Sequence, residues 1–468
     1  MSEHILFLTG KLAEKSLHRI LQSIQPTLFG YDVLNIGINV AGLMTADLIR
    51  RRVTDTGSAT RVVVPGRCRG DLQALTQHYG VAFERGPEEL KDLPEFFGTK
   101  SKRRDLSRHD VMIFAEIVDA TQLDVAAIVQ RADRFRRDGA DVIDLGCLPD
   151  VTFPHLEDAI NALKSAGFRV SVDSVDPKEL LRGGKAGADY LLSLKEDTLW
   201  VAEEVDSIPI LIPSESGDLA SLYRSVELLE TKNRPFIADA ILDPIHFGFT
   251  RSILRYHALR ERFPEVEIMM GVGNLTELTD ADTSGINAIL MGIVSELGIR
   301  SILTTEVSPH ARRAVREADA ARGIMFAARE DMSLPKDYSA ALLTTHGRKP
   351  FPDTETEIRS IAAAIKDPSF RVQVSEVGLH AYNRDGFHTG QDPFAIFPHL
   401  DLEQDGSHAF YLGVELARAQ IAWQLGKRYV QDQELDWGVA TETKQEDQSA
   451  YHVMGTTLQA RKQLKRDE

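Results

Sequence analysis

The chain has 468 residues, and at roughly 150 residues per domain this length predicts about three domains. Its 54 Lys and Arg residues against 70 Asp and Glu residues give a net charge of −16, which argues against a nucleic-acid-binding protein. Two cysteines, Cys68 and Cys147, exclude a disulfide framework and a cysteine-rich zinc site. No apolar run approaches the roughly 18–20 residues that span a membrane, and the first residues lack the order of a secretory signal. We therefore expect a soluble, cytoplasmic protein with no membrane partner.

The first 98 residues alternate strand-like and helix-like patterns. Apolar runs at 5–8, 33–36 and 61–64 each end close to a glycine, and a helical pattern covers 41–50. This repeated order of a strand, a glycine and a helix predicts an N-terminal Rossmann-like α/β domain with a parallel sheet over 1–98. A linker with a basic cluster follows at 98–109.

The alternation becomes regular between residues 110 and 328. Continuous apolar runs, typical of strands buried on both faces, predict strands at 111–117, 141–145, 169–173, 189–193, 208–212, 236–242, 267–271 and 300–304. Helical patterns follow them at 123–138, 155–166, 176–186, 196–204, 217–230, 250–263, 284–297 and 309–322. Eight strand–helix pairs of this total length favour a (βα)8 TIM barrel over a doubly wound sheet.

The region 335–440 predicts a small C-terminal α+β domain. It contains apolar segments at 340–343 and 370–377, a loop rich in Gly, His and Asp at 380–392, and a long helical pattern at 408–430. Four histidines and three aspartates gather there at spacings that match no zinc pattern, so a conformational or partner-docking role is favoured: His380, His388, His399, His408, Asp385, Asp392 and Asp401. A polar tail is predicted at 441–468.

Polar residues recur where the barrel strands end, which is where TIM barrels carry their function. They are Glu116, Asp119, Asp144, Asp173, Asp243, Asn274 and Glu306. A lone strand-end Asp is more often a helix N-cap, but several carboxylates within apolar strands are too costly to bury without partners. Because no basic residues alternate with them at these strand ends, we expect a ligand or a metal ion to supply the partners.

Two ligand classes suit this ring of carboxylates. A divalent ion with phosphate would use the oxygen atoms. A flat heterocycle with a ring N–H beside an exocyclic amine would dock on a carboxylate through both donors, and a pterin has that donor pair. Asn274 would add a donor and an acceptor at the rim.

The strand-end motifs resemble those of the pterin-binding barrel family, which contains dihydropteroate synthase and the methyltetrahydrofolate-binding methyltransferases. The second predicted strand ends Val-Ile-Asp-Leu-Gly at 142–146, and the third ends Ser-Val-Asp-Ser at 171–174. The sixth ends Leu-Asp-Pro at 242–244, followed by Phe-Gly-Phe-Thr at 247–250. The likeness covers about residues 110–325.

The flanking domains make the chain similar to the dihydropteroate synthase-related proteins of organisms that make tetrahydromethanopterin. The resemblance implies a transferase of one-carbon metabolism that condenses a hydroxymethyl-dihydropterin diphosphate with an arylamine, a ribosylated aminobenzene phosphate in place of p-aminobenzoate. It implies a pterin of the dihydropterin or tetrahydromethanopterin type, Mg²⁺, and a homodimer.

The resemblance also implies roles for individual residues. Asp144, Asp173 and Asp243 would be the catalytic, pterin-contacting carboxylates, with Ser193 and Asn274 as further pterin contacts. Glu116 and Asp119, with Asp144, would hold magnesium. The lysine and arginine with which synthases bind pterin and phosphate are absent from their usual positions, so His246, Arg251, His310 and Arg312 are the candidate phosphate partners.

Two alternatives remain open. Gly273-Asn274 resembles the methyltransferase branch of the family, where an Asn lies beside N5 of the reduced pterin, and this predicts a methyl-tetrahydropterin-dependent methyltransferase. The third reading is a non-catalytic pterin-binding protein that has lost the diphosphate site.

Overall fold

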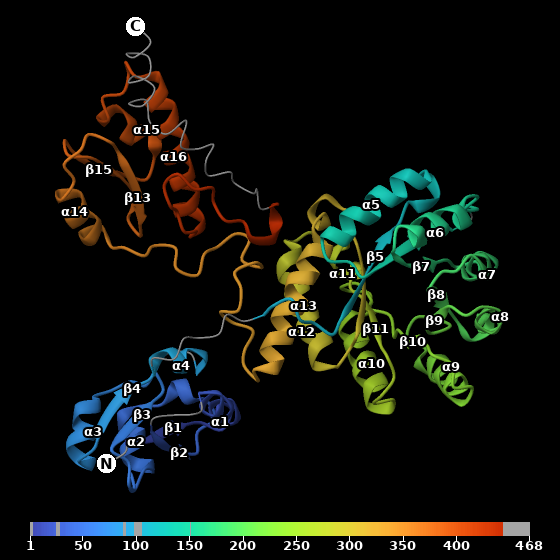
Figure 1. Ribbon diagram of the computed structural model, residues 1–468, viewed down its shortest axis with the longest axis horizontal. Helices are drawn as coiled ribbons and strands as arrows, with labels where there is room; N and C mark the ends of the chain where they lie inside the picture. The colour runs from blue at the N-terminus through green and yellow to red at the C-terminus, as the bar shows by residue number, and fades with distance from the viewer. Residues whose placement is uncertain (1–2, 25–28, 88–89, 98–104, 150, 443–468) are drawn as a thin grey trace. The chain divides into compact units, whose positions relative to one another are not determined.

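The computed structural model describes residues 3–24, 29–87, 90–97, 105–149 and 151–442 (Figure 1). The chain forms two compact units, one of Met1–His109 with Phe326–Tyr338 and one of Asp110–Met325 with Ser339–Glu468. The basic cluster of the predicted linker and the predicted tail beyond residue 442 lie outside the described residues. Within the described ranges, no helix is both long enough and apolar enough to cross a membrane.

A four-stranded parallel sheet organises the N-terminal unit, with the strand order β2-β1-β3-β4. The strands are β1 (His4–Thr9), β2 (Gly30–Asn35), β3 (Arg61–Val64) and β4 (Ala82–Arg85). Helices α1 (Glu14–Ser23) and α4 (Leu93–Phe96) pack on one face of the sheet, and α2 (Ala46–Arg52) and α3 (Leu72–Tyr79) on the other. The result is an α/β/α layering. The sequence pattern missed β4, whose four residues bury only Phe83.

Eight parallel strands form the central sheet of the second unit. They are β5 (Met112–Ile117), β6 (Val142–Gly146), β7 (Arg169–Asp173), β8 (Tyr190–Leu194), β9 (Ile208–Leu211), β10 (Ile237–Ala238), β11 (Met269–Gly271) and β12 (Ser301–Thr305). The helices are α5 (Val125–Arg137), α6 (Leu156–Ser165), α7 (Pro177–Lys185), α8 (Val201–Glu204), α9 (Leu219–Thr231), α10 (Phe249–Arg262), α11 (Gly273–Thr276), α12 (Thr283–Glu296) and α13 (Ala314–Glu330).

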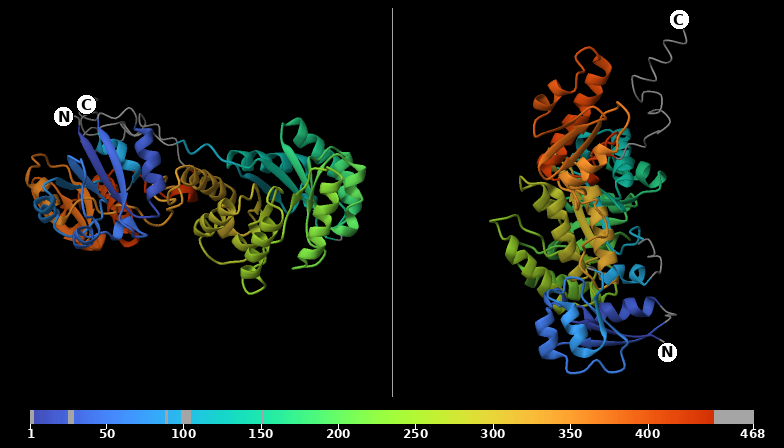
Figure 2. Two further views of the ribbon diagram at one scale, coloured as in Figure 1. Left: turned by 90° about the horizontal axis from the view of Figure 1, so that it is seen from below. Right: turned by 90° about the vertical axis from the view of Figure 1, so that its left-hand side faces the viewer.

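The central sheet curls into a nearly closed barrel with the order β10-β9-β8-β7-β6-β5-β12-β11, consistent with the predicted TIM barrel. A single bridge between Ala238 and Ile268 joins its two ends. Helices α5 to α9 lie outside the strands (Figure 1, Figure 2). Apolar side chains fill the interior below the mouth, and these include Phe114, Val142, Tyr190, Leu192, Ile210, Ile237 and Met269. The barrel is therefore a packed core with its polar residues confined to one end.

The sixth strand is shorter than the predicted 236–242. It ends at Ala238 because the Asp239 carboxylate turns back to accept the backbone N–H of Ile241 at 2.7 Å. Ile241 then takes a left-handed conformation, with φ 60°, which no continuing strand can hold. The residues that were predicted to complete the strand instead form a polar loop at the mouth.

The C-terminal residues form an antiparallel sheet with the order β13-β14-β15, where β13 is Arg371–Ser375, β14 is Gly378–Tyr382 and β15 is Phe387–Gly390. The prediction of a loop over 380–392 was therefore wrong, since most of that segment lies in a hairpin. Its glycines, histidines and aspartates hid the alternation, although β14 is buried throughout. Helix α16 (Gly406–Leu425) packs on the sheet, and α14 (Glu355–Ala363) and α15 (Pro393–Ile396) complete this part.

Candidate active site

Three carboxylates from adjacent strands meet at the mouth of the barrel. Glu116 of β5, Asp144 of β6 and Asp173 of β7 each offer an oxygen atom within 4.8 Å of the other two. Register explains the meeting, because Glu116 pairs with Asp144 across the sheet and Asp173 lies one inward-facing step further along β7. The structure thus brings together two of the three predicted pterin carboxylates, Asp144 and Asp173, and two of the three predicted metal ligands, Glu116 and Asp144.

Burial raises the pKa values of all three groups, and repulsion by neighbouring carboxylates adds to the rise for Glu116 and Asp144. Loss of solvation, with smaller contributions from Asp173 and Glu277, raises the pKa of Glu116 to about 8. Loss of solvation raises the pKa of Asp173 to about 6, against a hydrogen bond from the Ser193 side chain. The pKa of Asp144, which is fully buried, lies well above its usual range for the same reason and because Asp173 and Glu116 are close. The cluster therefore favours protons, a cation or N–H donors.

One of the two carboxylate oxygens of Asp144 has a hydrogen-bond donor and the other has none among the described residues. The Ser171 hydroxyl donates to Oδ1 of Asp144. The other oxygen, Oδ2, is buried and accepts no hydrogen bond from any residue in the described ranges. An unpaired buried carboxylate oxygen is costly, so the site is built to receive a partner there.

Gly146, at the end of β6, makes room for the cluster. A Cβ at this position would lie 2.7 Å from Oε1 of Glu116 and 3.0 Å from Cα of Val118. We expect Gly146→Ala to destabilise the protein by about 1–3 kcal/mol through overpacking, measured by urea unfolding. Gly292→Ala, in α12 with open space around the added methyl, is the matched control and should be neutral or stabilising. Equal unfolding midpoints for the two variants would contradict the assigned role of Gly146.

Asp243 has a cationic partner that the sequence pattern did not reveal. Arg255 of α10 donates to Oδ2 of Asp243 at 2.7 Å, and the same guanidinium donates to the carbonyls of Ala240 and Ile241 at 3.1 and 2.7 Å. The expectation that the strand-end acids lack basic partners was wrong at this position, and also at Asp119 and Glu306, which pair with Arg131 and Arg134. The arginine arises from the following helix, so a search along the strand ends could not find it.

Asp239 is a further mouth carboxylate that the sequence analysis missed. It is 8% exposed, and Tyr256 of α10 donates its hydroxyl to Oδ1 of Asp239 at 2.5 Å. Burial, with a contribution from the nearby Asp173, raises its pKa to about 6. The predicted strand 236–242 placed Asp239 in mid-strand, which concealed its position at the end of β10.

The two predicted neutral pterin contacts lie at strand ends. Ser193 is half-buried in β8 and donates to Asp173. Asn274 is exposed at the start of α11, a short helix that the sequence pattern did not predict, and its amide donates to the carbonyl of Leu242 at 2.8 Å. Asn274 therefore ties the loop after β10 to the loop after β11.

The remaining candidates are less closely gathered. Asp119 is not in the carboxylate cluster, because it pairs with Arg131 at 2.6 Å. The ring of His310 is 3.0 Å from the carbonyl of Thr276, which occupies one of its nitrogens. Three phosphate candidates are exposed: His246, Arg251 and Arg312. Glu306, at the end of β12, is paired with Arg134 at 2.7 Å.

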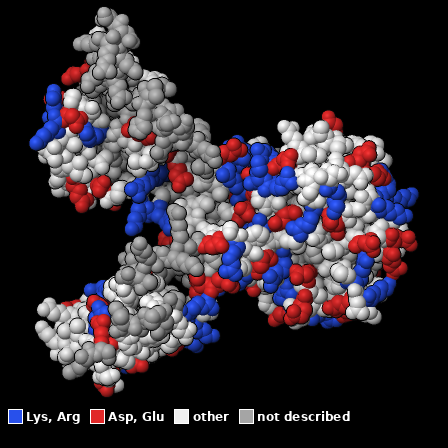
Figure 3. Space-filling model, viewed as in Figure 1, with Lys and Arg blue, Asp and Glu red and all other residues white. Residues whose placement is uncertain are grey.

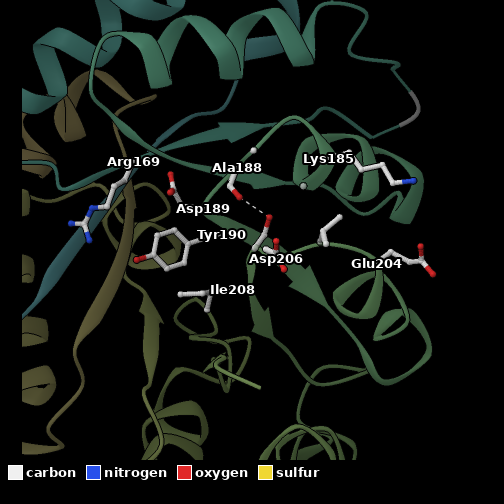
Figure 4. Close-up of a pocket in the computed structure, with 12 residues that line it drawn as sticks. Arg169, Lys185, Ala188, Asp189, Tyr190, Glu204, Asp206 and Ile208 are labelled. Carbon is white, nitrogen blue, oxygen red and sulfur yellow. Dashed lines mark hydrogen bonds between the residues drawn. The ribbon is translucent and has the colours of Figure 1, made fainter. Parts of the chain in front are cut away.

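Two surface hollows lie at opposite ends of the barrel strands. One, of about 430 Å³, is lined by Lys195, Glu196, Asp197 and Ser214, which follow β8 and β9 on the mouth side. Lys195 is thus a mouth cation that sequence reasoning overlooked. The other, of about 660 Å³, lies at the amino ends of β7, β8 and β9, where Figure 4 shows Arg169, Tyr190 and Ile208. It includes none of the predicted site residues.

The surface of the barrel carries charges of both signs. Lys and Arg are interspersed with Asp and Glu over the face seen in Figure 3. Exposed ion pairs of this kind contribute little to stability. The acids Glu116, Asp144 and Asp173, whose pKa values are raised, lie instead inside the mouth.

Comparison with other proteins gives two sequence matches. Residues 3–88 match a family model described as a family of unknown function (DUF6513). The uncharacterized protein MJ0107 of Methanocaldococcus jannaschii is 24% identical over 528 residues, which cover 92% of this chain and 98% of the relative.

Among solved structures, the chain is similar to dihydropteroate synthases over about half of its length. The enzyme of Thermus thermophilus in complex with 6HMPPP gives a TM-score of 0.37 at 20% identity, covering 48% of this chain and 95% of that chain. The Yersinia pestis enzyme with a pterine-sulfa conjugate gives 0.36 at 19% identity, with the same coverage. The enzyme of Vibrio fischeri gives 0.37 at 15% identity, covering 49% of this chain and 96% of that chain.

Proposed function

We propose that residues 110–328 form a pterin-binding barrel that condenses a hydroxymethyl-dihydropterin diphosphate with an arylamine. The observation that carries the proposal is the meeting of Glu116, Asp144 and Asp173 in one mouth, with raised pKa values and an unpaired oxygen on Asp144. Such a site favours a ligand rich in N–H donors, a cation, or both. The strand-end motifs resemble those that hold pterins, and a pterin supplies the donors.

In this reaction the protein mainly has to orient the two substrates and to neutralise the charge of the departing diphosphate. The amine nitrogen forms a bond to the pterin methylene carbon while the bond to the diphosphate oxygen breaks, and the amine loses a proton. Asp144, Asp173 and Asp243 would hold the pterin, with Ser193 and Asn274 beside it, so that the methylene faces the incoming amine. Orientation of this kind supplies much of the rate enhancement in two-substrate reactions.

A divalent cation fits the cluster. The donors are three carboxylates whose oxygens approach one another closely, and Oδ2 of Asp144 is left without a partner in the described structure. Oxygen ligands of this type suit Mg²⁺. We propose that Glu116 and Asp144, with Asp173, hold it, and that it would offset the charge of the departing diphosphate. Asp119 was also proposed from the sequence, but its contact with Arg131 argues against that role.

The two substrates would place the protein in tetrahydromethanopterin or folate-like cofactor synthesis, with a ribosylated aminobenzene phosphate as the favoured arylamine. The phosphates would need cations, and the candidates are His246, Arg251, His310 and Arg312. A homodimer is part of the proposal. The flanking parts, 1–98 and 335–440, are proposed as separate domains around the barrel.

The deciding experiment measures diphosphate release from hydroxymethyl-dihydropterin diphosphate with Mg²⁺ and either arylamine. We expect release with the wild type, and a loss of about 100-fold or more in kcat/KM for Asp173→Asn, because the variant loses a charged acceptor for the pterin. Asp243→Asn should weaken pterin binding about tenfold. Unchanged pterin affinity in Asp243→Asn would show that this residue does not contact the pterin.

Methyl transfer from a methyl-tetrahydropterin is the second candidate. It is favoured by the position of Asn274, which is fixed at the mouth by Leu242, and by the exposure of three of the four phosphate candidates. An Asn beside N5 would help that nitrogen become a better leaving group. Pterin binding without diphosphate release in the same assay would favour this function, or binding without catalysis, over the synthase.

A further inference from the structure

Asp239, at the carboxyl end of β10, points into the mouth of the barrel. Alternation along a strand sends every second side chain to the same face. Ile237 belongs to the apolar interior of the barrel, whereas Ala238 packs outward against the helices. The backbone N–H of Asp239 still donates to the carbonyl of Leu211 on β9 at 2.8 Å, so the alternation continues and Asp239 lies above Ile237.

One oxygen of Asp239 is fully occupied and the other is not. Oδ1 accepts the Tyr256 hydroxyl at 2.5 Å and the N–H of Ile241 at 2.7 Å. Tyr256 is itself fixed, being fully buried and bonded to the backbone of Gly271. No residue in the described parts of the chain donates a hydrogen bond to Oδ2, although the side chain is more than nine-tenths buried. Because the carboxylate is held in place and Oδ2 has no donor among these residues, Oδ2 is available to accept a hydrogen bond from a ligand.

A glycine borders the space in front of Oδ2. Gly271 ends β11, two residues after the inward-facing Met269, and a Cβ built on it would meet Oδ2 of Asp239 at 3.9 Å as its only neighbour within 4 Å. Asp243, four residues further on, differs in kind, because Arg255 already neutralises it. The loop after β10 therefore presents one paired and one unpaired carboxylate to the mouth.

We propose that Oδ2 of Asp239 accepts the ring N–H that a reduced pterin carries and an oxidised pterin lacks, which makes Asp239 a specificity-determining residue. This rests on the proposed pterin site. In a dihydropterin the reduced pyrazine ring carries an N–H donor, whereas the same nitrogen in an oxidised pterin offers a lone pair that a carboxylate repels. The pyrimidine donors are common to both ligands and are assigned to the other carboxylates, Asp243 among them.

Asp239→Asn tests the assignment with little change of shape. The amide can keep Oδ1 for Tyr256 and Ile241 but places an NH₂ group where Oδ2 was, so it opposes a ligand N–H. Dissociation constants would be measured anaerobically for 6-hydroxymethyl-7,8-dihydropterin and for oxidised 6-hydroxymethylpterin. We expect the variant to lose about 10- to 100-fold in affinity for the dihydropterin and to bind the oxidised ligand at least as tightly as the wild type does, because the NH₂ group can donate to the lone pair of the oxidised ring.

Matched variants separate the loss of the Asp239 contact from a general loss of pterin binding. Asp206→Asn, exposed before β9 at the other end of the barrel, should change neither affinity. Asp243→Asn should weaken both ligands alike. Should Asp239→Asn fail to fold, Gly271→Ser replaces it, because a hydroxyl there can occupy Oδ2 and should weaken the dihydropterin selectively.

The outcomes are distinct. Asp239→Asn that binds both ligands like the wild type, or loses both equally, overturns the role of Asp239 while leaving the pterin site standing. A wild-type protein that binds neither ligand overturns the proposed function itself, and the role of Asp239 with it.

Discussion

In the presence of a chelator, the wild-type protein should lose stability as the pH rises from about 5 to 8, and Glu116→Gln should make that loss measurably smaller. The pKa of Glu116 lies at about 8 in the folded protein, against an ordinary value of 4.5. The folded state therefore holds a proton across this window that the unfolded chain has released. The contribution of Glu116 to stability is full below about pH 4.5 and falls by about 1.4 kcal/mol per pH unit until the folded pKa is passed.

The measurement is a series of urea unfolding curves between pH 4.5 and 8.5. Glutamine cannot ionise, so Glu116→Gln keeps the shape and abolishes the titration at that position. The remaining slope comes from the other acids with raised pKa values, which include Asp144, Asp173, Asp239 and Glu306. Glu230→Gln, at an exposed position on α9, should leave the wild-type slope unchanged. Added Mg²⁺ should raise wild-type stability most at high pH, where the cluster is ionised. A flat wild-type profile in the chelator would contradict the raised pKa.

Arg255→Ala is expected to destabilise the protein by about 3–5 kcal/mol. The guanidinium and the carboxylate of Asp243 are both nearly buried, with 11% and 12% of their side chains exposed. Removing one partner of a buried pair leaves the other charge uncompensated, and here the carbonyls of Ala240 and Ile241 lose a donor as well.

Urea unfolding at pH 7 measures the effect of Arg255→Ala. Arg251→Ala, exposed on the same helix, should cost less than about 0.5 kcal/mol. Adding Asp243→Asn to Arg255→Ala should recover part of the loss, since the uncompensated charge is then gone. A double variant no more stable than Arg255→Ala alone would show that the carbonyl contacts, and not the charge pair, dominate.

The barrel could be predicted because its strands are continuous apolar runs and its helices follow at regular intervals. Strand ends were placed within one or two residues where the run stops at a change of polarity, as at Asp173. The end of the sixth strand was predicted wrongly, because apolar residues continue through Leu242 in the sequence while the backbone already turns at Asp239. A side chain that caps its own backbone leaves no periodic signal.

Part of the candidate site followed from the sequence and part did not. Glu116, Asp144 and Asp173 were predicted to share a mouth, and the register of three neighbouring strands brings them together. Arg255 and Tyr256 lie on the outer face of the barrel wall, on a helix, and reach the loop from behind. Contacts that join an element to the turn before it depend on the geometry of the loop, which composition and periodicity do not encode.

The closing seam of the barrel lies beside these same residues. The seam consists of the bridge between Ala238 and Ile268, and Tyr256 fastens it by contacting both Asp239 and Gly271. Because few contacts join strands β10 and β11, the barrel should open locally there first. The amide protons at 237–239 and 268–271 should therefore exchange with solvent sooner than those of the opposite wall. A ligand that contacts both β10 and β11 would hold the two strands together, so that ligand binding in the mouth would also make the barrel wall more rigid.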